Sequence, residues 1–84
     1  MPSRTRRSVG SAHSPRYKRF LHRLRQARED AGLTQVQVAR TLRRHQSFVA
    51  KCESGERRVD VVELLDFAKL YKKPLTYFAH GVDD

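Results

Sequence analysis

The chain contains two capping boxes, and these constrain its fold more than any other feature of the sequence. Thr34 is followed three residues later by Gln37, and Asp60 is followed by Glu63 in the same way. In such a pair each side chain satisfies a free backbone amide at the start of a helix. The dipeptide Ser14-Pro15 adds a third start, because serine caps a helix and proline fits its first position. The sequence therefore predicts helices that begin near residues 14, 34 and 60.

Apolar residues recur at three- and four-residue intervals after each start, which is the period of an α-helix with one buried face. Two more helices are expected: one at 46–53, between the second and third of these starts, and a short last one that Pro74 opens. No segment shows the alternation of a strand, so the predicted fold is all-α with five helices. The last helix, with Leu75 and Phe78, serves either the core or a dimer contact. In chain order, the residues expected to be buried are Tyr17, Phe20, Leu21, Leu24, Ala27, Ala31, Val38, Ala39, Leu42, Val49, Cys52, Val61, Leu64, Leu65, Ala68 and Tyr71.

The bulk composition limits the class of protein. At 84 residues the chain has room for one small domain. A single cysteine, Cys52, cannot form an internal disulfide, which fits a reducing compartment. No apolar run approaches the roughly 20 residues that a membrane-spanning helix needs. We therefore expect a cytoplasmic protein with no membrane partner.

Positive charge is concentrated at the amino-terminal end. The net charge of +9 arises from 18 lysines and arginines against 9 acidic residues, and every acidic residue follows Arg28. Such a skew favours a polyanionic partner, with nucleic acid first and an anionic membrane surface second. The alternative is that the charge only keeps a small protein in solution.

Residues 1–13 differ in composition from the rest of the chain. They hold Arg4, Arg6 and Arg7, three serines, and only Val9 as a large apolar group. This is too little apolar surface to offset the entropy lost on ordering. We predict a flexible basic arm at 1–13 and one domain at 14–84. An organellar transit peptide has a similar composition and is the alternative for the arm.

The segment 41–48, TLRRHQSF, connects the second and third predicted helices. Two helices joined by three or four residues form a helix-turn-helix, here at about residues 34–53. Turns usually contain Gly, Asn or Ser, but this one contains Arg43, Arg44 and His45. A left-handed arginine at the end of a helix costs about 1 kcal/mol. Either the turn bears that strain or it adopts another shape, and contact with DNA phosphates would offset the strain.

A resemblance to a known family covers most of the chain, from about residue 21 to residue 78. The stretch LTQVQVARTLRRHQSFVAKCESGERRVDVVELLDFAKLY resembles the Cro/C1-type, or XRE-family, DNA-binding domain of lambdoid phage repressors and small bacterial regulators. The resemblance implies a five-helix Cro/C1 repressor-like bundle, in which the places of Arg43 and Lys72 are usually glycine. The residues that carry it are Leu33, Thr34, Gln35, Ala39, Leu42, Gln46, Ser47, Val49, Glu53, Gly55 and Leu64 to Ala68.

The resemblance also implies which residues contact DNA, with helix 46–53 in the major groove. A glutamine amide both donates and accepts hydrogen bonds and can therefore pair with adenine, while serine and lysine suit several bases. Phe48 is left open between the core and contact with a thymine methyl group. The implied base contacts are Gln46, Ser47, Ala50 and Lys51. The phosphate contacts are Gln35, Ser54, Arg57 and Arg58 from the resemblance, and Arg43 and Arg44 from the charge of the turn. Within the arm, Arg4, Arg6 and Arg7 are expected to contact phosphates or the minor groove.

Nothing in the sequence indicates an enzyme, a cofactor or a metal site. A Gly-rich phosphate loop and a nucleophile elbow are both missing, and the four histidines and Cys52 lack the spacing of metal ligands. The interpretation is a sequence-specific transcriptional regulator, a repressor or antitoxin-like autoregulator of a bacterium or phage, associated with the nucleoid.

Such a regulator binds an inverted repeat in double-stranded DNA as a homodimer. The family often dimerises through its last helix, and a toxin or another regulator would be the protein partner. The alternative is a non-catalytic protein-interaction module. Its basic arm would bind RNA or an anionic surface without sequence specificity.

Overall fold

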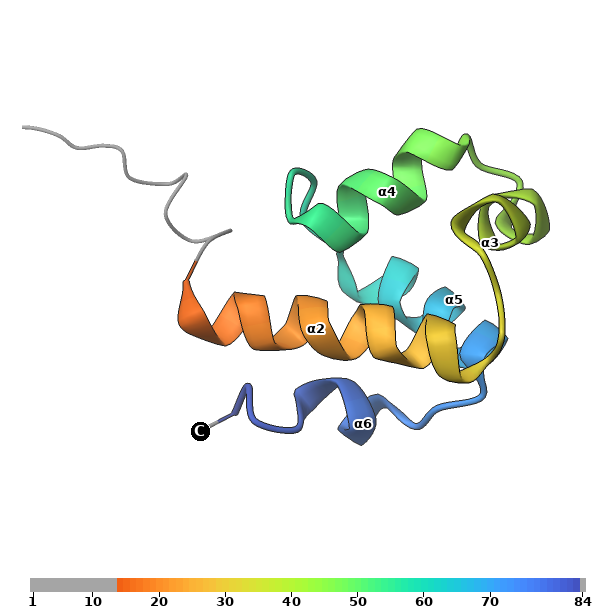
Figure 1. Cartoon of the computed structure of the whole chain (residues 1–84). Coiled ribbons are helices and arrows are strands. Elements are labelled where there is room, and N and C mark those ends of the chain that lie inside the picture. Colours follow the sequence, from red (N-terminus) through yellow and green to blue (C-terminus); the bar gives the residue numbers. More distant parts are fainter. Residues whose placement is uncertain (1–13, 84) are drawn as a thin grey trace, which may run out of the picture.

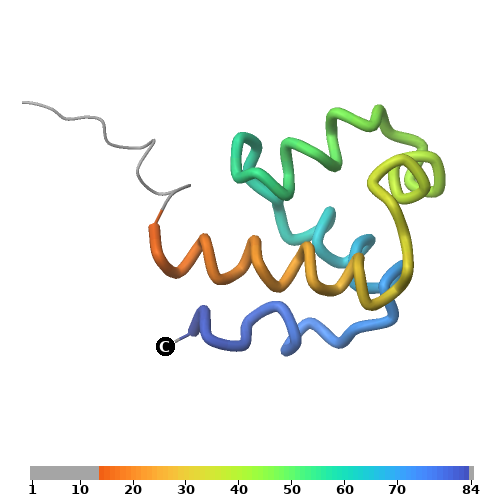
Figure 2. Tube along the Cα trace, viewed as in Figure 1, coloured from red at the N-terminus to blue at the C-terminus, as the bar shows by residue number. Residues whose placement is uncertain are grey.

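Five helices make up the computed structural model, which describes residues 14–83 and contains no strand among them. Figure 1 shows α4 and α6 on opposite sides of α2, and the trace in Figure 2 runs from α3 through a tight turn into α4. The predicted all-α, five-helix fold is confirmed, and the predicted arm at 1–13 lies outside the described residues. The helices are α2 (Pro15–Asp30), α3 (Gln35–Leu42), α4 (Gln46–Ser54), α5 (Val61–Tyr71) and α6 (Leu75–Ala79).

The predicted capping groups lie at the starts of three helices. The hydroxyl of Ser14 caps α2. At α3, the Thr34 hydroxyl accepts from the amide of Gln37 at 3.1 Å, and the Gln37 side chain accepts from the amide of Thr34 at 2.8 Å. Asp60 and Glu63 make the same exchange at α5, at 2.8 and 3.1 Å. Both predicted capping boxes are therefore confirmed.

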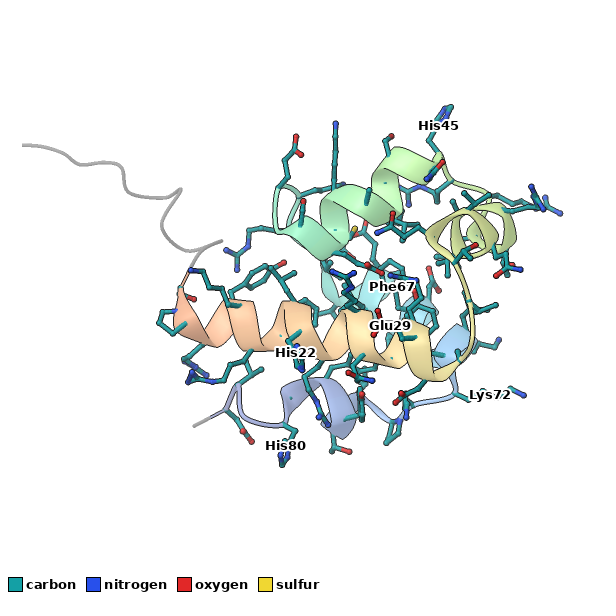
Figure 3. The ribbon with its side chains drawn as sticks, in the orientation of Figure 1. His22, Glu29, His45, Phe67, Lys72 and His80 are labelled. Atoms are coloured by element: carbon teal, nitrogen blue, oxygen red, sulfur yellow. The ribbon has the colours of Figure 1, made fainter. Side chains whose placement is uncertain are left out.

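Every helix contributes to one core. Figure 3 shows Phe67 of α5 in the middle of the bundle, where its ring stacks on that of Phe48 with 6.0 Å between the centroids. Phe48 is thus a core residue. Cys52 is fully buried, and this burial raises the pKa of its thiol, as expected of a small apolar residue in the core. The largest fully buried side chains are Leu24, Val38, Val49, Cys52, Phe67 and Phe78.

The prediction for the buried face of α5 was partly wrong. The core side of this helix carries Phe67 and Tyr71, whose rings stack 5.8 Å apart, and Ala68. The helix is apolar on two sides, and spacing alone does not say which side is buried; the side with two aromatic rings removes more apolar area from water. The residues that were expected to be buried but are exposed are Ala31, at the end of α2, and Val61 and Leu65 of α5.

Three arginines of α2 hold the carboxyl-terminal segment. The Nε groups of Arg16 and Arg19 donate to backbone carbonyls of residues 81–82. Arg23 donates to the Tyr77 carbonyl at 2.9 Å, and its guanidinium lies 3.8 Å from the centre of the Tyr77 ring. Cations near a helix end satisfy carbonyls that have no partner within the helix. Part of the amino-terminal charge excess is therefore used inside the fold.

One mostly buried ion pair joins α2 to the helix-turn-helix. Arg28 of α2 donates two hydrogen bonds to Glu53 of α4, at 2.7 and 3.1 Å, and the two side chains are only 11% and 6% exposed. Gln35 of α3 donates to the same carboxylate at 3.0 Å. Arg28 also donates to the carbonyl of Leu33 at 2.8 Å. These bonds fix α3 and α4 relative to α2.

Glu53→Ala should lower the free energy of unfolding by about 3 kcal/mol, because Arg28 would keep a mostly buried charge without its carboxylate partner. Glu29→Ala is the matched control. It removes an ion pair with Arg25 on the surface of α2, which is worth at most about 1 kcal/mol. Urea unfolding of both variants measures the difference. Equal losses would contradict a dominant role for the buried pair.

Candidate nucleic-acid interface

The turn between α3 and α4 has a left-handed residue at the predicted position. Arg43 has φ 58° and ψ 44°, and the amide of Arg44 donates to the carbonyl of Ala39 at 2.9 Å. Lys72 ends α5 with almost the same angles, φ 59° and ψ 45°. Glycine adopts these angles without cost, whereas a side chain does not. The sequence left open whether Arg43 would be left-handed or the turn would adopt another shape. The left-handed, strained turn is the one observed.

One side of α4 is polar and exposed. Gln46, Ser47 and Lys51 are exposed and Ala50 is half-buried, whereas Val49 is buried. Positions i, i+1, i+4 and i+5 share a helix face, so the four residues proposed to read bases lie together on α4.

The amino end of α4 is not closed by a side chain. His45 is the N-cap residue but makes no side-chain capping hydrogen bond. Figure 3 shows His45 at the outer end of α4, pointing away from the bundle. The first amides of a helix and its positive dipole end attract anions. The start of α4 therefore adds a partial positive charge beside the arginines of the turn.

Arg44 and Arg57 are engaged within the protein. Their guanidinium groups lie 3.7 and 4.8 Å from the centre of the Phe48 ring. Arg57 donates two hydrogen bonds to Glu63, at 2.8 and 2.7 Å, and Arg44 lies 4.0 Å from the same carboxylate. The ion pair with Arg57 lowers the pKa of Glu63. The sequence identified Glu63 only as a capping residue, since nothing in its spacing indicated the two arginines.

The other predicted phosphate contacts have different surroundings. The amide of Gln35 is bonded to Glu53, which links α3 to α4. The Ser54 hydroxyl donates to the carbonyl of Lys51 at 3.2 Å, and the Arg58 guanidinium lies 4.7 Å from the centre of the Tyr17 ring. Arg43 is exposed. Each of these contacts with DNA stays a prediction.

Residues 14–83 contain neither a metal-binding cluster nor a membrane-spanning helix. No group of three or more His, Cys, Asp or Glu side chains in that range could hold a metal ion. No helix in the same range is both long enough and apolar enough to cross a membrane.

The comparison with protein families agrees with this geometry. A family model described as a helix-turn-helix domain matches residues 19–76, which span α3, the turn and α4. The chain belongs to this family of DNA-binding helix-turn-helix domains. Searches of curated proteins and of solved structures gave no significant match.

Arg43→Gly should raise the free energy of unfolding by about 1 kcal/mol, because glycine accepts the left-handed angles. It should also weaken DNA binding, because a charge is removed beside α4. Lys72→Gly is the matched control: it relieves the same strain at the end of α5, which Figure 3 shows well apart from His45, and should leave DNA binding unchanged. Thermal melts and duplex titrations measure both effects. A melt that falls for Arg43→Gly would contradict the strain argument.

Proposed function

We propose that the chain is a sequence-specific transcriptional regulator of the XRE, or Cro/C1, type, with α4 as its recognition helix. The observation that carries the proposal is the exposed polar face of α4, set on a helix-turn-helix whose angle is fixed by the buried pair of Arg28 and Glu53. The major groove of B-DNA admits one α-helix, and the side chains on its outer face meet the base edges.

Gln46, Ser47 and Lys51 are the proposed base-reading residues, and Ala50 allows close approach of the helix. The amide of Gln46 suits adenine, and Lys51 suits the acceptors of guanine. The uncapped amides at the start of α4 favour a phosphate at the edge of the groove. Direct readout and backbone contact would thus come from the same short helix.

The remaining contacts are proposed for the backbone of the duplex. Arg43 lies in the turn before α4 and Ser54 is the last residue of that helix, and both are exposed. Each is proposed to meet a phosphate at one edge of the groove. Arg44 and Arg57 keep N–H donors for a phosphate even when they stack on an aromatic ring, because a guanidinium has five. Arg58 is proposed as a third phosphate contact on this side. Gln35 acts through Glu53 by holding α4 in position.

We further propose that the regulator is a repressor or an antitoxin-like autoregulator in a bacterial or phage-infected cytoplasm. One recognition helix reads too few base pairs for useful affinity, so a homodimer on an inverted repeat is expected. An antitoxin would in addition bind its toxin. The competing hypothesis, an interaction module that binds polyanions by charge, does not require the polar face of α4.

Gln46→Ala should cost about 1 to 3 kcal/mol on the preferred duplex and little on random DNA, because it removes a base contact and no charge. Gln26→Ala is the control, since this glutamine lies on α2 and donates to Asp30 at 3.0 Å. Titrations of both duplexes at one salt concentration measure the ratio. Equal losses on both duplexes would remove Gln46 from base readout and favour the interaction module.

Deleting residues 1–13 should weaken binding to every duplex, because Arg4, Arg6 and Arg7 are proposed to meet phosphates or the minor groove. The melting temperature should hardly change, because the described core begins at Phe20. For each phosphate that the arm neutralises, the deletion should reduce the slope of log affinity against log salt by about 0.9. An unchanged slope would show that the arm does not touch DNA.

A further inference from the structure

Two arginines that lie on either side of α4 in the sequence converge on one ring and one carboxylate. Arg44 precedes α4 and Arg57 follows it, with the whole nine-residue helix between them. Both guanidinium groups lie over the ring of Phe48, at 3.7 and 4.8 Å from its centre. Both also lie within 4.0 Å of the Glu63 carboxylate on α5. One negative charge is thus shared between two arginines that the proposed function assigns to phosphates.

The carboxylate of Glu63 is held in place by the capping box of α5. It accepts from the amide of Asp60 at 3.1 Å, while the amide of Glu63 donates to the Asp60 side chain at 2.8 Å. The same carboxylate accepts two hydrogen bonds from Arg57, at 2.8 and 2.7 Å. The side chain of Glu63 is 13% exposed and that of Arg57 is 39% exposed. Arg57 is therefore bonded to a fixed and mostly buried anion.

Transferring the charge of Arg57 from Glu63 to DNA costs free energy. An arginine that donates two parallel hydrogen bonds to a carboxylate makes one of the stronger polar contacts in proteins. If Arg57 moved wholly to a phosphate, Glu63 would keep a mostly buried charge without its partner, which is unfavourable. Arg57 thus contributes less to DNA binding than a fully exposed arginine would.

Arg44 is held more loosely than Arg57. Its guanidinium lies 4.0 Å from the Glu63 carboxylate, which is beyond hydrogen-bonding distance, and its side chain is 43% exposed. A cavity of about 30 Å³, lined by Arg44, Glu63 and Asp66 among others, leaves room for the guanidinium to move. Glu63 therefore weakens the positive potential at Arg44 without fixing its position.

We propose that Glu63 is a specificity-determining residue, because it offsets the charge of Arg44 and Arg57 and so limits binding to DNA of any sequence. The inference rests on the proposed function, in which these arginines are phosphate contacts. Phosphate contacts supply the affinity for random DNA and carry no sequence information, whereas base contacts supply the difference between duplexes.

Random DNA gains most when the offset is removed. On the preferred duplex, the base contacts of α4 fix its register, so Arg44 and Arg57 meet only the phosphates that this register brings near. On random DNA no register is fixed, and the protein adopts the placement with the best phosphate contacts. Arginines released from Glu63 should therefore strengthen random binding more than specific binding. The ratio of the two affinities should fall.

Glu63→Gln isolates the charge of this residue, because glutamine also forms a capping box and should preserve the start of α5. Its affinity for a random duplex should rise about fivefold at roughly 100 mM salt. The slope of log affinity against log salt should steepen by about 0.9 for each arginine that gains a phosphate. The preferred duplex, obtained by selection from a random pool, should gain less. Titrations of both duplexes over a range of salt concentrations measure these changes.

Glu56→Gln is the matched control. It removes the same charge from an exposed position next to Arg57 in the sequence, and within residues 14–83 Glu56 forms no ion pair. This variant should strengthen binding to both duplexes slightly and equally, and it should leave the salt slope unchanged. When Arg44 and Arg57 are both replaced by glutamine, Glu63→Gln should have no more effect than Glu56→Gln.

Elution from immobilised heparin, a polyanion without bases, repeats the comparison in the absence of DNA. Glu63→Gln should elute at higher salt than Glu56→Gln, because two arginines regain their full charge rather than one surface charge being removed. Thermal melts show that each variant is folded. Elution of the two variants at the same salt concentration would contradict the offset.

The outcomes separate this inference from the proposed function. Equal salt slopes for Glu63→Gln and Glu56→Gln, or weaker binding of Glu63→Gln to random DNA, would overturn the role of Glu63 even if α4 reads DNA. A steeper slope for Glu63→Gln in a protein that prefers no duplex would leave the charge offset intact and remove the regulator. A protein that binds no duplex would also remove the regulator, and elution from heparin would still decide for or against the offset.

Discussion

The buried ion pair between Arg28 and Glu53 is the constraint on which the rest of the structure depends. It joins the end of α2 to the end of α4, and Gln35 adds α3 to the same carboxylate. A buried ion pair contributes little net stability compared with apolar packing, but the hydrogen bonds of this one, at 2.7 and 3.1 Å, set one relative placement of the two helices. In this protein that placement is the angle of the helix-turn-helix. The exposed face of α4 has a fixed direction because this network holds it.

The basic residues of the chain have three different kinds of surroundings. Arg16, Arg19 and Arg23 bond to carbonyls near the carboxyl end. Arg44 and Arg57 stack on Phe48 beside Glu63, so their charge is partly balanced within the fold. Arg43 and Lys51, at the turn and on α4, are exposed. The net charge of the chain therefore says less about DNA binding than the positions where it is left uncompensated.

Much of this fold could be predicted from local sequence, and the remainder could not for physical reasons. Both capping boxes depend on a few neighbouring residues, so their patterns were sufficient. The shape of the turn at Arg43 stayed open between two alternatives, because an arginine has no strong local preference for left-handed angles. The buried side of α5 and the pair of Arg28 with Glu53 depend on residues distant in the chain. The one sequence feature that pointed to this pair is the position of Arg28 beside the apolar stripe of α2, where a charge is partly removed from water. The roles assigned to Gln46, Ser47 and Lys51 follow from a family resemblance and from exposure.

The most direct test of the central claim, that α4 reads a specific sequence, is selection of bound duplexes from a random pool, repeated at raised salt. The account predicts enrichment of an inverted repeat that persists as salt rises, because base contacts discriminate between duplexes while phosphate contacts weaken uniformly. A pool that stays random, with binding that fades with salt alone, would contradict it.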